Sequence, residues 1–335
     1  MANTVCWQGT TLEGLVLHHL AAKKTSTRGC ALRCSSVCPA IATGHRLWLK
    51  AGPHRLTRTS DLQHLFQTQQ SMRRTGVARA AASPRAELKT YEEAPPKDGQ
   101  SRFYMNPMCP YAQRSWVGVK YKGLDNELES VEVDLRKMPQ WYKDLYPVGK
   151  VPSIEHNGKV TGESLDVLKY LDTHFDGPKL EPASKEDRVT VQKLVEFCDR
   201  ELVPLGFGTA SMKDAAPHEY KKGIKPVLDV LERQLEAAEA AGKGPYLVGG
   251  FSTADAAILP FLWRFQFIFE NFRGLDLFED HPRLAKYFQI VSEQPFFAET
   301  KPAHERMHAT YKTFLDMDYF GKIGLARKPT AAAAS

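Results

Sequence analysis

The sequence predicts a chain with two folded parts, an α/β unit followed by an all-helical unit. Short extended runs alternate with helical patterns between about 98 and 180. From about 184 to 320, apolar residues recur at helical spacing and no strand pattern is found. A cysteine, Cys109, stands between the extended run 102–106 and the helical pattern that follows it.

The first 80 residues differ in composition from the rest of the chain. They carry 11 Lys and Arg but only two acids, although the whole chain of 335 residues has a net charge of only +6. A segment rich in Arg, Ser, Thr and Ala and poor in acid is typical of an organellar transit peptide. We therefore expect residues 1–80 to be a disordered transit peptide. A basic arm that binds RNA or a membrane surface is the alternative.

The remaining body is mildly acidic, so we expect it to bind no nucleic acid. No run of about 18 apolar residues occurs, and we expect no membrane-spanning helix. The body contains only two cysteines, Cys109 and Cys198, which indicates a reducing compartment. Three cysteines in the leader share a regular spacing but lack a fourth ligand, and we expect no metal site: Cys30, Cys34 and Cys38.

Cys109 is the candidate nucleophile. It precedes Pro110, which suits the first position of a helix, so the thiol would lie at a helix N-terminus. The unpaired N–H groups and the helix dipole at that end favour the thiolate, which is the reactive form. Because Ala112 replaces a second cysteine, an outside thiol such as glutathione must resolve any mixed disulfide. An ordinary buried cysteine is the alternative.

The order of elements in the first unit is strand, helix, strand, short helix, hairpin and helix, which is the thioredoxin arrangement. The second strand is expected at 130–135 and the short helix at 141–145. Asn157-Gly158 between two short extended runs is a strong hairpin signal. The last helix is expected from Ser164 to Phe175.

Pro152 stands at the start of the third strand, where this arrangement places a proline facing the active cysteine. We predict a cis Val151–Pro152 bond, since cis costs little before proline. The backbone of Val151 would then pair with an extended ligand, as an added strand does. A trans proline at an edge strand is the alternative.

Glu163 and Ser164 follow the hairpin. Ser164 suits a helix N-cap, and a helix N-terminus can hold a carboxylate. The γ-glutamyl carboxylate of glutathione would bind at Ser164, and Glu163 would bind its ammonium group. A plain cap beside a solvated acid is the alternative.

The second unit opens with Ser184 and Asp187 at capping-box spacing. Cys198 lies within the apolar stripe of the helix that follows, and we expect it in the core. A later helix contains Pro260, which should bend it. The tail from 326 to 335 is expected to be disordered.

Aromatic residues occupy every second position from Trp263 to Phe269. At helical phasing, Phe265 and Phe269 share one face, while Trp263 and Phe267 lie on another. One face can belong to the core and the other can line an acceptor pocket. Trp263 and Phe267 are the candidate pocket residues.

Together these motifs resemble the cysteine-type glutathione transferases, and among them the plant lambda class. The matching stretches are Cys109-Pro110-Tyr111-Ala112-Gln113-Arg114, Trp141-Tyr142-Lys143, Lys150-Val151-Pro152, Glu155-His156-Asn157-Gly158, 162–178, Pro260-Phe261 and Arg264-Phe265-Gln266. The Cys-Pro-x-Ala motif alone is shared with omega-class enzymes. The resemblance covers about 100–315.

The resemblance implies the glutathione transferase architecture and an enzyme that uses glutathione as co-substrate and no metal. It implies thiol transfer and removal of glutathione from conjugates or mixed disulfides, rather than conjugation. Catalysis would use Cys109, and glutathione would bind at Tyr111, Lys150, Val151, Pro152, Glu163 and Ser164. It also implies a monomer, and its plant character favours the chloroplast over the mitochondrion. Met138 stands where relatives often have Lys or Arg, so Lys137 or Lys150 would neutralise the glycyl carboxylate.

Two other functions remain open at this point. Dehydroascorbate reduction uses the same cysteine chemistry, although related enzymes with that activity carry Ser where Ala112 stands. A carrier of flavonoid-like ligands, with catalysis secondary, is the alternative outside enzymology.

Overall fold

The computed structural model describes residues 88–329. The predicted transit peptide, 1–80, and the last residues of the predicted tail, 330–335, lie outside this range. The first unit comprises these elements in order: β1 (Ser101–Met105), α2 (Pro110–Lys122), η1 (Leu124–Asn126), β2 (Leu128–Glu132), α3 (Gln140–Leu145), β3 (Ser153–His156), β4 (Lys159–Gly162) and α4 (Ser164–His174). This is the predicted thioredoxin-like order.

The four strands form one mixed sheet in the order β2-β1-β3-β4. β1 runs parallel to β2 and antiparallel to β3, and β4 runs antiparallel to β3. The predicted turn at Asn157 and Gly158 joins β3 to β4, with both residues at positive φ, as a two-residue hairpin turn requires. The predicted cis bond between Val151 and Pro152 is present. The second strand begins two residues earlier than predicted and ends at Glu132.

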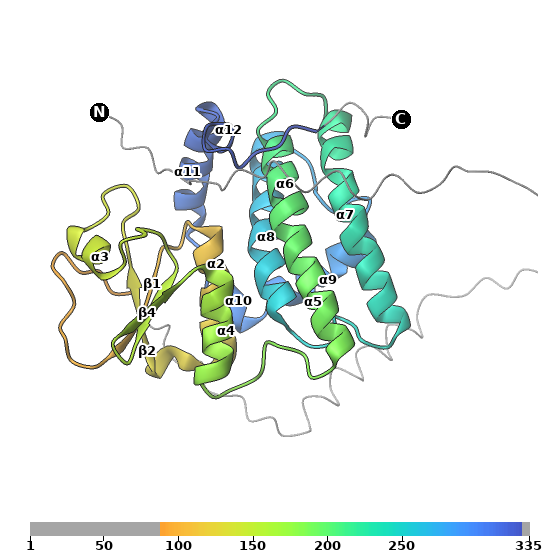
Figure 1. The fold of residues 1–335 in the computed structure, drawn as a ribbon. Coiled ribbons are helices and arrows are strands. Elements are labelled where there is room, and N and C mark those ends of the chain that lie inside the picture. The colour runs from red at the N-terminus through yellow and green to blue at the C-terminus, as the bar shows by residue number, and fades with distance from the viewer. Residues whose placement is uncertain (1–87, 330–335) are drawn as a thin grey trace, which may run out of the picture. The chain divides into compact units, whose positions relative to one another are not determined.

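α2 and α4 pack side by side between the sheet and the helical unit (Figure 1). One face of α2 contributes Trp116 and Val119 to the core shared with the sheet. Val117, on another face, belongs to the core of the helical unit. α2 therefore joins the two units, and the residue that caps it lies near both.

The helical unit contains α5 (Lys185–Phe197), the π-helical turn η2 (Cys198–Leu202), α6 (Val203–Ala210), α7 (Pro217–Ala240), α8 (Thr253–Arg273), α9 (Pro282–Ser292), α10 (Pro295–Ala298), α11 (His304–Asp316) and α12 (Tyr319–Lys322). The core of this unit is built around α8, which packs against α2, α5, α6, α9 and α11. A helix that is apolar on all sides is a buried one. The run 256–269 is such a segment, and it contains one charged residue, Arg264.

The N-terminus of α8 is fixed by Asp255. Its carboxylate accepts hydrogen bonds from the Ser252 N–H and hydroxyl, at 2.9 and 2.8 Å. Burial raises the pKa of Asp255 to about 6, although these hydrogen bonds oppose the shift. The predicted cap at Ser184 is also present, with its side chain accepting from the Asp187 N–H.

The first residues of the predicted tail, 326–329, lie within the described range and contact α6, and disorder of the tail stays a prediction. Arg327 donates its N–H to the Pro204 carbonyl at 2.8 Å and forms an ion pair with Glu201. The tail backbone fits against α6 because Gly208 has no side chain there. A Cβ atom at Gly208 would lie 1.9 Å from the Arg327 carbonyl oxygen.

Candidate functional site

Strand register gathers the predicted site residues at one end of the sheet. Tyr104 pairs with Ser153, and Ser153 pairs with Gly162. The C-terminal end of β1, the N-terminal end of β3 and the C-terminal end of β4 therefore meet at the same edge. Cys109 follows the first of these ends, Pro152 precedes the second, and Glu163 follows the third.

Cys109 is the N-cap residue of α2, with an extended backbone, and Pro110 occupies the first turn. Its backbone is anchored by the Cys109 N–H, which donates to the Asn106 carbonyl at 3.0 Å. The side chain is half-buried, and Sγ lies 3.9 Å from the Val151 carbonyl oxygen. The cysteine and the segment of Pro152 are thus neighbours, as predicted.

The expected lowering of the Cys109 pKa is not found. Burial raises the pKa of the Cys109 thiol above its ordinary value. The N–H groups of Ala112 and Tyr111 and the guanidinium groups of Arg264 and Arg114 oppose this shift only in part. The helix N-terminus lowers the pKa of the thiol, as predicted, but desolvation of the thiolate raises it by more.

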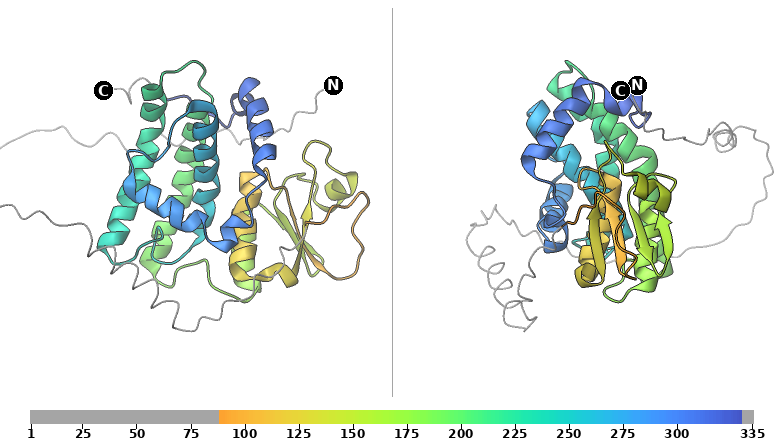
Figure 2. Two further views of the ribbon diagram at one scale, coloured as in Figure 1. Left: turned by 180° about the vertical axis from the view of Figure 1, so that it is seen from behind. Right: turned by 90° about the vertical axis from the view of Figure 1, so that its left-hand side faces the viewer.

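The C-terminal helices also lie near Cys109. α11 lies beside the N-terminal end of α2 in both orientations (Figures 1 and 2). Tyr311 of α11 and Tyr319 of α12 both interact electrostatically with Cys109. Because these residues are some 200 positions further along the chain, the local strand, cysteine and helix pattern gives no sign of them.

The segment around Pro152 is held rigidly. The Tyr142 hydroxyl donates to the Lys150 carbonyl at 2.6 Å and lies 3.0 Å from the Ser153 hydroxyl. Val151 is 8% exposed, so little of this residue is accessible. Lys150 is half-buried.

Glu163 and Ser164 lie at the start of α4, but the predicted capping role is wrong. Glu163 is the N-cap residue, at φ 64°, and Ser164 is the first helical residue. A residue with positive φ turns the chain sharply at this point, which shifts the cap by one position. Ser164 is buried, Glu163 is exposed, and the Ser115 hydroxyl on α2 donates to the Ser164 carbonyl at 2.9 Å. The N-terminus of α4 is thereby tied to the cysteine helix.

Tyr111 faces the helical unit. Its ring meets Phe261 of α8 edge-on, with centroids 5.1 Å apart, and the Arg114 guanidinium lies 5.0 Å from the ring centroid. It stands two residues beyond Cys109, between α2 and α8. Its predicted contact with glutathione stays a prediction.

The two candidate acceptor residues differ in exposure. Trp263 is half-buried, whereas Phe267 is 7% exposed. Phe267 packs against His304 and Tyr311 of α11, at centroid distances of 5.2 and 6.4 Å. Phe265 and Phe269 are fully buried on the opposite face, as predicted. Phe267 therefore faces α11, whereas the Trp263 ring lies 6.5 Å from the Phe297 ring of α10, centroid to centroid.

Sequence reasoning assigned no role to the polar residues beneath Cys109. Arg264 is fully buried and donates to the carbonyls of Pro107 and Met108, at 3.1 and 3.5 Å. Gln113, also buried, accepts from Arg264 and donates to the Thr300 hydroxyl at 2.9 Å. One signal was available, because Arg264 is the single charge within an apolar helical run.

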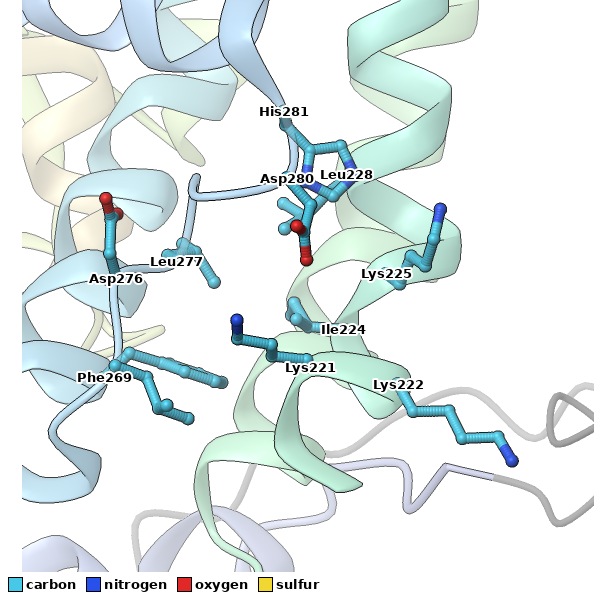
Figure 3. A pocket seen from close by; sticks show the side chains of 11 residues that line it. Lys221, Lys222, Ile224, Lys225, Leu228, Phe269, Asp276, Leu277, Asp280 and His281 are labelled. Carbon is cyan, nitrogen blue, oxygen red and sulfur yellow. The ribbon is translucent and has the colours of Figure 1, made fainter. Parts of the chain in front are cut away.

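A cavity of about 220 Å³ lies elsewhere, between α7, the end of α8 and the loop before α9 (Figure 3). It contains none of the predicted site residues. Its lining includes Lys221, paired with Glu279, Lys225, paired with Asp229, and His281, hydrogen-bonded to Asp229. Within 88–329, no cluster of three metal-ligating side chains is found, and no helix is long and apolar enough to span a bilayer.

Two domain profiles match the chain. The glutathione S-transferase N-terminal domain matches residues 103–179, and the C-terminal domain matches residues 205–300. The chain is 39% identical to Protein IN2-1 homolog B of Oryza sativa subsp. indica, over 61% of this chain and 81% of the relative. It is 35% identical to the chloroplastic glutathione S-transferase L2 of Arabidopsis thaliana, over 64% of this chain and 70% of the relative.

Solved structures agree in fold. Glutathione transferase Omega 3C from Trametes versicolor superposes with a TM-score of 0.54 at 25% identity, over 66% of this chain and 93% of that one. Rice GST1, solved with glutathione, superposes with a TM-score of 0.56 at 24% identity, over 66% of this chain and 99% of that one. With both domains matched and lambda-class relatives similar along both, the chain belongs to the glutathione S-transferase family, as a glutathione transferase enzyme similar to the cysteine-type plant lambda class.

Proposed function

We propose that this glutathione transferase acts as a thiol transferase that removes glutathione from mixed disulfides, through a covalent intermediate on Cys109. The position of Cys109 carries this proposal. Cys109 is the N-cap residue of α2, its side chain is half-buried, and Sγ lies 3.9 Å from the Val151 carbonyl oxygen. Ala112 supplies no second sulfur at the fourth position of the motif, so the intermediate must be resolved from outside.

The reaction has two thiol–disulfide exchanges. The Cys109 thiolate attacks the glutathione sulfur of a mixed disulfide, forming a Cys109–glutathione disulfide and releasing the other partner as a thiolate, which takes up a proton. The thiolate of a second glutathione then attacks the bound glutathione sulfur. Oxidised glutathione leaves, and the Cys109 thiolate is regenerated. Exchange through a mixed disulfide requires no metal and no base beyond those that ionise the two thiols.

The glutathionyl group would bind at the edge of the sheet where β1 and β4 end and β3 begins. The Val151 backbone would pair with its cysteinyl unit, beside Pro152. The first amides of α4, at Ser164, suit the γ-glutamyl carboxylate, because they have no partner within the helix. Glu163, exposed at the same helix end, would bind the ammonium group. Tyr111 would flank the tripeptide from the α8 side.

The remaining contacts concern the two ends of the substrate. Lys150 is adjacent to Val151 and is proposed to bind the glycyl carboxylate, with Lys137 as the other candidate. Trp263, half-buried on α8, is proposed to line the acceptor side together with the more deeply placed Phe267.

A comparison of three assays tests the proposal. Purified protein is given a mixed disulfide of glutathione with a small thiol, dehydroascorbate, or a fluorescent flavonoid-like ligand, with reduced glutathione present. We expect turnover of the mixed disulfide to exceed that of dehydroascorbate by tenfold or more, on the order of 1.4 kcal/mol in transition-state stabilisation. Faster dehydroascorbate turnover would make the protein a dehydroascorbate reductase. Ligand binding without turnover of either substrate would make it a carrier.

Localisation and assembly are also proposed. The basic, acid-poor first 80 residues support import into the chloroplast, where the thiol chemistry would use stromal glutathione. A fluorescent protein fused after residue 87 should enter plastids, and mitochondrial fluorescence would overturn this. We further propose a monomer, which light scattering of the purified protein checks.

A further inference from the structure

Arg264 is a buried charge with an unusual set of partners. Its side chain is inaccessible to solvent, and it occupies the middle of α8 within the apolar run 256–269. Its guanidinium donates to the carbonyl oxygens of Pro107, Met108 and Pro260 and to the side-chain oxygen of Gln113. Tyr311 also favours the charged form of Arg264. All of these partners are formally neutral.

No carboxylate forms an ion pair with Arg264 among residues 88–329. Its Nε–H group is buried and has no hydrogen-bond partner. A buried ion without a counter-charge is strongly unfavourable, so proteins rarely retain one without compensation. Neutral carbonyl oxygens solvate the guanidinium only in part.

A second fully buried arginine, where α2 packs against α8, has a carboxylate as counter-charge. Arg114, on α2, is 1% exposed and forms an ion pair with Asp199 at 2.5 Å. It also donates to the Ala257 carbonyl at 2.9 Å. Arg114 and Arg264 are thus both buried between α2 and α8, but only Arg114 has a carboxylate partner. The two can therefore be compared directly.

The unpaired guanidinium is bound to the turn that presents Cys109. Pro107 and Met108 are the two residues before the cysteine, and Gln113 lies one helical turn after it. The positive charge of Arg264 favours the Cys109 thiolate, and Cys109 in turn favours the charged form of Arg264. An anion at Sγ is therefore the missing compensation for this charge.

We infer that Arg264 is a positioning residue of the site, whose uncompensated positive charge stabilises the ionised form of Cys109. The inference rests on the proposed thiol chemistry, but it concerns only the proton on Cys109. In the free protein, burial disfavours the thiolate, and Arg264 reduces that penalty. When the proton leaves the Cys109 thiol, the resulting thiolate and the Arg264 guanidinium form a pair of opposite charges.

The test measures ionisation rather than turnover. The rate of alkylation by iodoacetamide is followed against pH at the peptide that contains Cys109, in the full chain. Arg264→Gln removes the charge but keeps N–H donors for the neighbouring carbonyls, and Arg264→Lys keeps the charge. We expect Arg264→Gln to raise the midpoint pH by on the order of one unit, which slows alkylation about tenfold below the midpoint. Arg264→Lys, which keeps the charge, should leave the midpoint pH much closer to that of the parent protein.

The matched control removes the paired guanidinium together with its partner, as Arg114→Met with Asp199→Asn. Because that pair has almost no net charge, the midpoint should stay within about 0.3 unit of the parent protein. If Arg264→Gln folds, as circular dichroism would show, and leaves the midpoint unchanged, the inference is overturned. An equal shift in Arg264→Gln and the control would assign Arg264 a purely structural role. Either result leaves the proposed thiol transfer intact.

A probe of charge on the parent protein covers the case in which Arg264→Gln does not fold. Anionic iodoacetate and neutral iodoacetamide are compared at Cys109, relative to N-acetylcysteine amide. A nearby uncompensated cation should raise the iodoacetate preference at least about threefold over that free thiol. Arg264→Lys should retain the preference. A preference equal to or below that of the free thiol would overturn the inference.

Discussion

The two cysteines of the described chain lie close to the same interface but in different environments. Cys109 caps α2 at the edge of the sheet and is half-buried, whereas Cys198 lies between α5 and α6 and is fully buried. Each has a buried arginine nearby, Arg264 for the first and Arg114 for the second. Burial raises the pKa of both thiols, that of Cys198 to about 12.

The difference is in what surrounds the sulfur. Cys198 Sγ accepts a hydrogen bond from the Arg114 guanidinium at 3.3 Å and lies 3.6 Å from the Ala257 carbonyl oxygen. The charge of Arg114, however, is already neutralised by Asp199. At Cys109, the N–H groups of the helix N-terminus and the Arg264 guanidinium, which has no carboxylate partner, favour the thiolate. Proximity to a positive side chain is common to both cysteines. Access to solvent and an uncompensated charge distinguish the candidate nucleophile.

The largest expected effect separates the two cysteines by turnover. Cys109→Ser should reduce turnover of a glutathione mixed disulfide by on the order of 10³-fold or more, because the attacking sulfur is lost. Cys198→Ala should stay within about twofold of the parent protein. Steady-state assays of the three proteins measure this. Comparable losses in both variants would remove the distinction between the two sites.

The next effect concerns the structural site. Arg114→Met breaks the buried ion pair and leaves Asp199 without its partner. We expect a loss of about 2–3 kcal/mol in the free energy of unfolding, below the usual cost for a fully buried pair because Asp199 is partly exposed. Chemical denaturation measures the loss. A change under about 0.5 kcal/mol would mean that the pair contributes little.

The pH dependence follows from the raised pKa of Cys109. A thiol with a raised pKa has a smaller thiolate share at neutral pH than free cysteine, so its alkylation should quicken as pH rises past neutrality. The midpoint should lie above the ordinary thiol value. Peptide mapping after timed alkylation at several pH values gives the profile. A midpoint below neutrality would show that the helix N-terminus and the arginines outweigh desolvation.

The smallest effect is the stability of the Cys198 environment. Cys198→Ala removes one buried sulfur from the core and should cost about 1 kcal/mol in the free energy of unfolding. Denaturation of this variant and of Cys109→Ser provides the comparison. A larger cost at Cys109 than at Cys198 would be unexpected, because the sulfur of Cys109 is only partly packed.

Local patterns predicted most of the fold and the chemistry of individual positions. The hairpin at Asn157-Gly158, the cis bond before Pro152 and the burial of Cys198 each depend on neighbouring residues or on a known arrangement of elements, and all are present. The helix start at Ser164 was predicted correctly, but the N-cap role belongs to Glu163, whose positive φ has no mark in the sequence.

Properties that depend on distant segments were missed. The electrostatic interactions of Cys109 with Tyr311 and Tyr319 come from α11 and α12, and the Arg264 guanidinium contacts the cysteine turn from α8. The contact of Arg327 with α6 was missed for the same reason, because its fit depends on Gly208. A sequence shows which residues can react, but tertiary packing sets how strongly they are desolvated.

Mass spectrometry of the native full chain after exposure to oxidised glutathione tests the central claim most directly. Peptide mapping should find a glutathionyl group on Cys109 and none on Cys198, and reduced glutathione should remove it. An unmodified Cys109, or a glutathionyl group on Cys198 in the folded protein, would contradict the account.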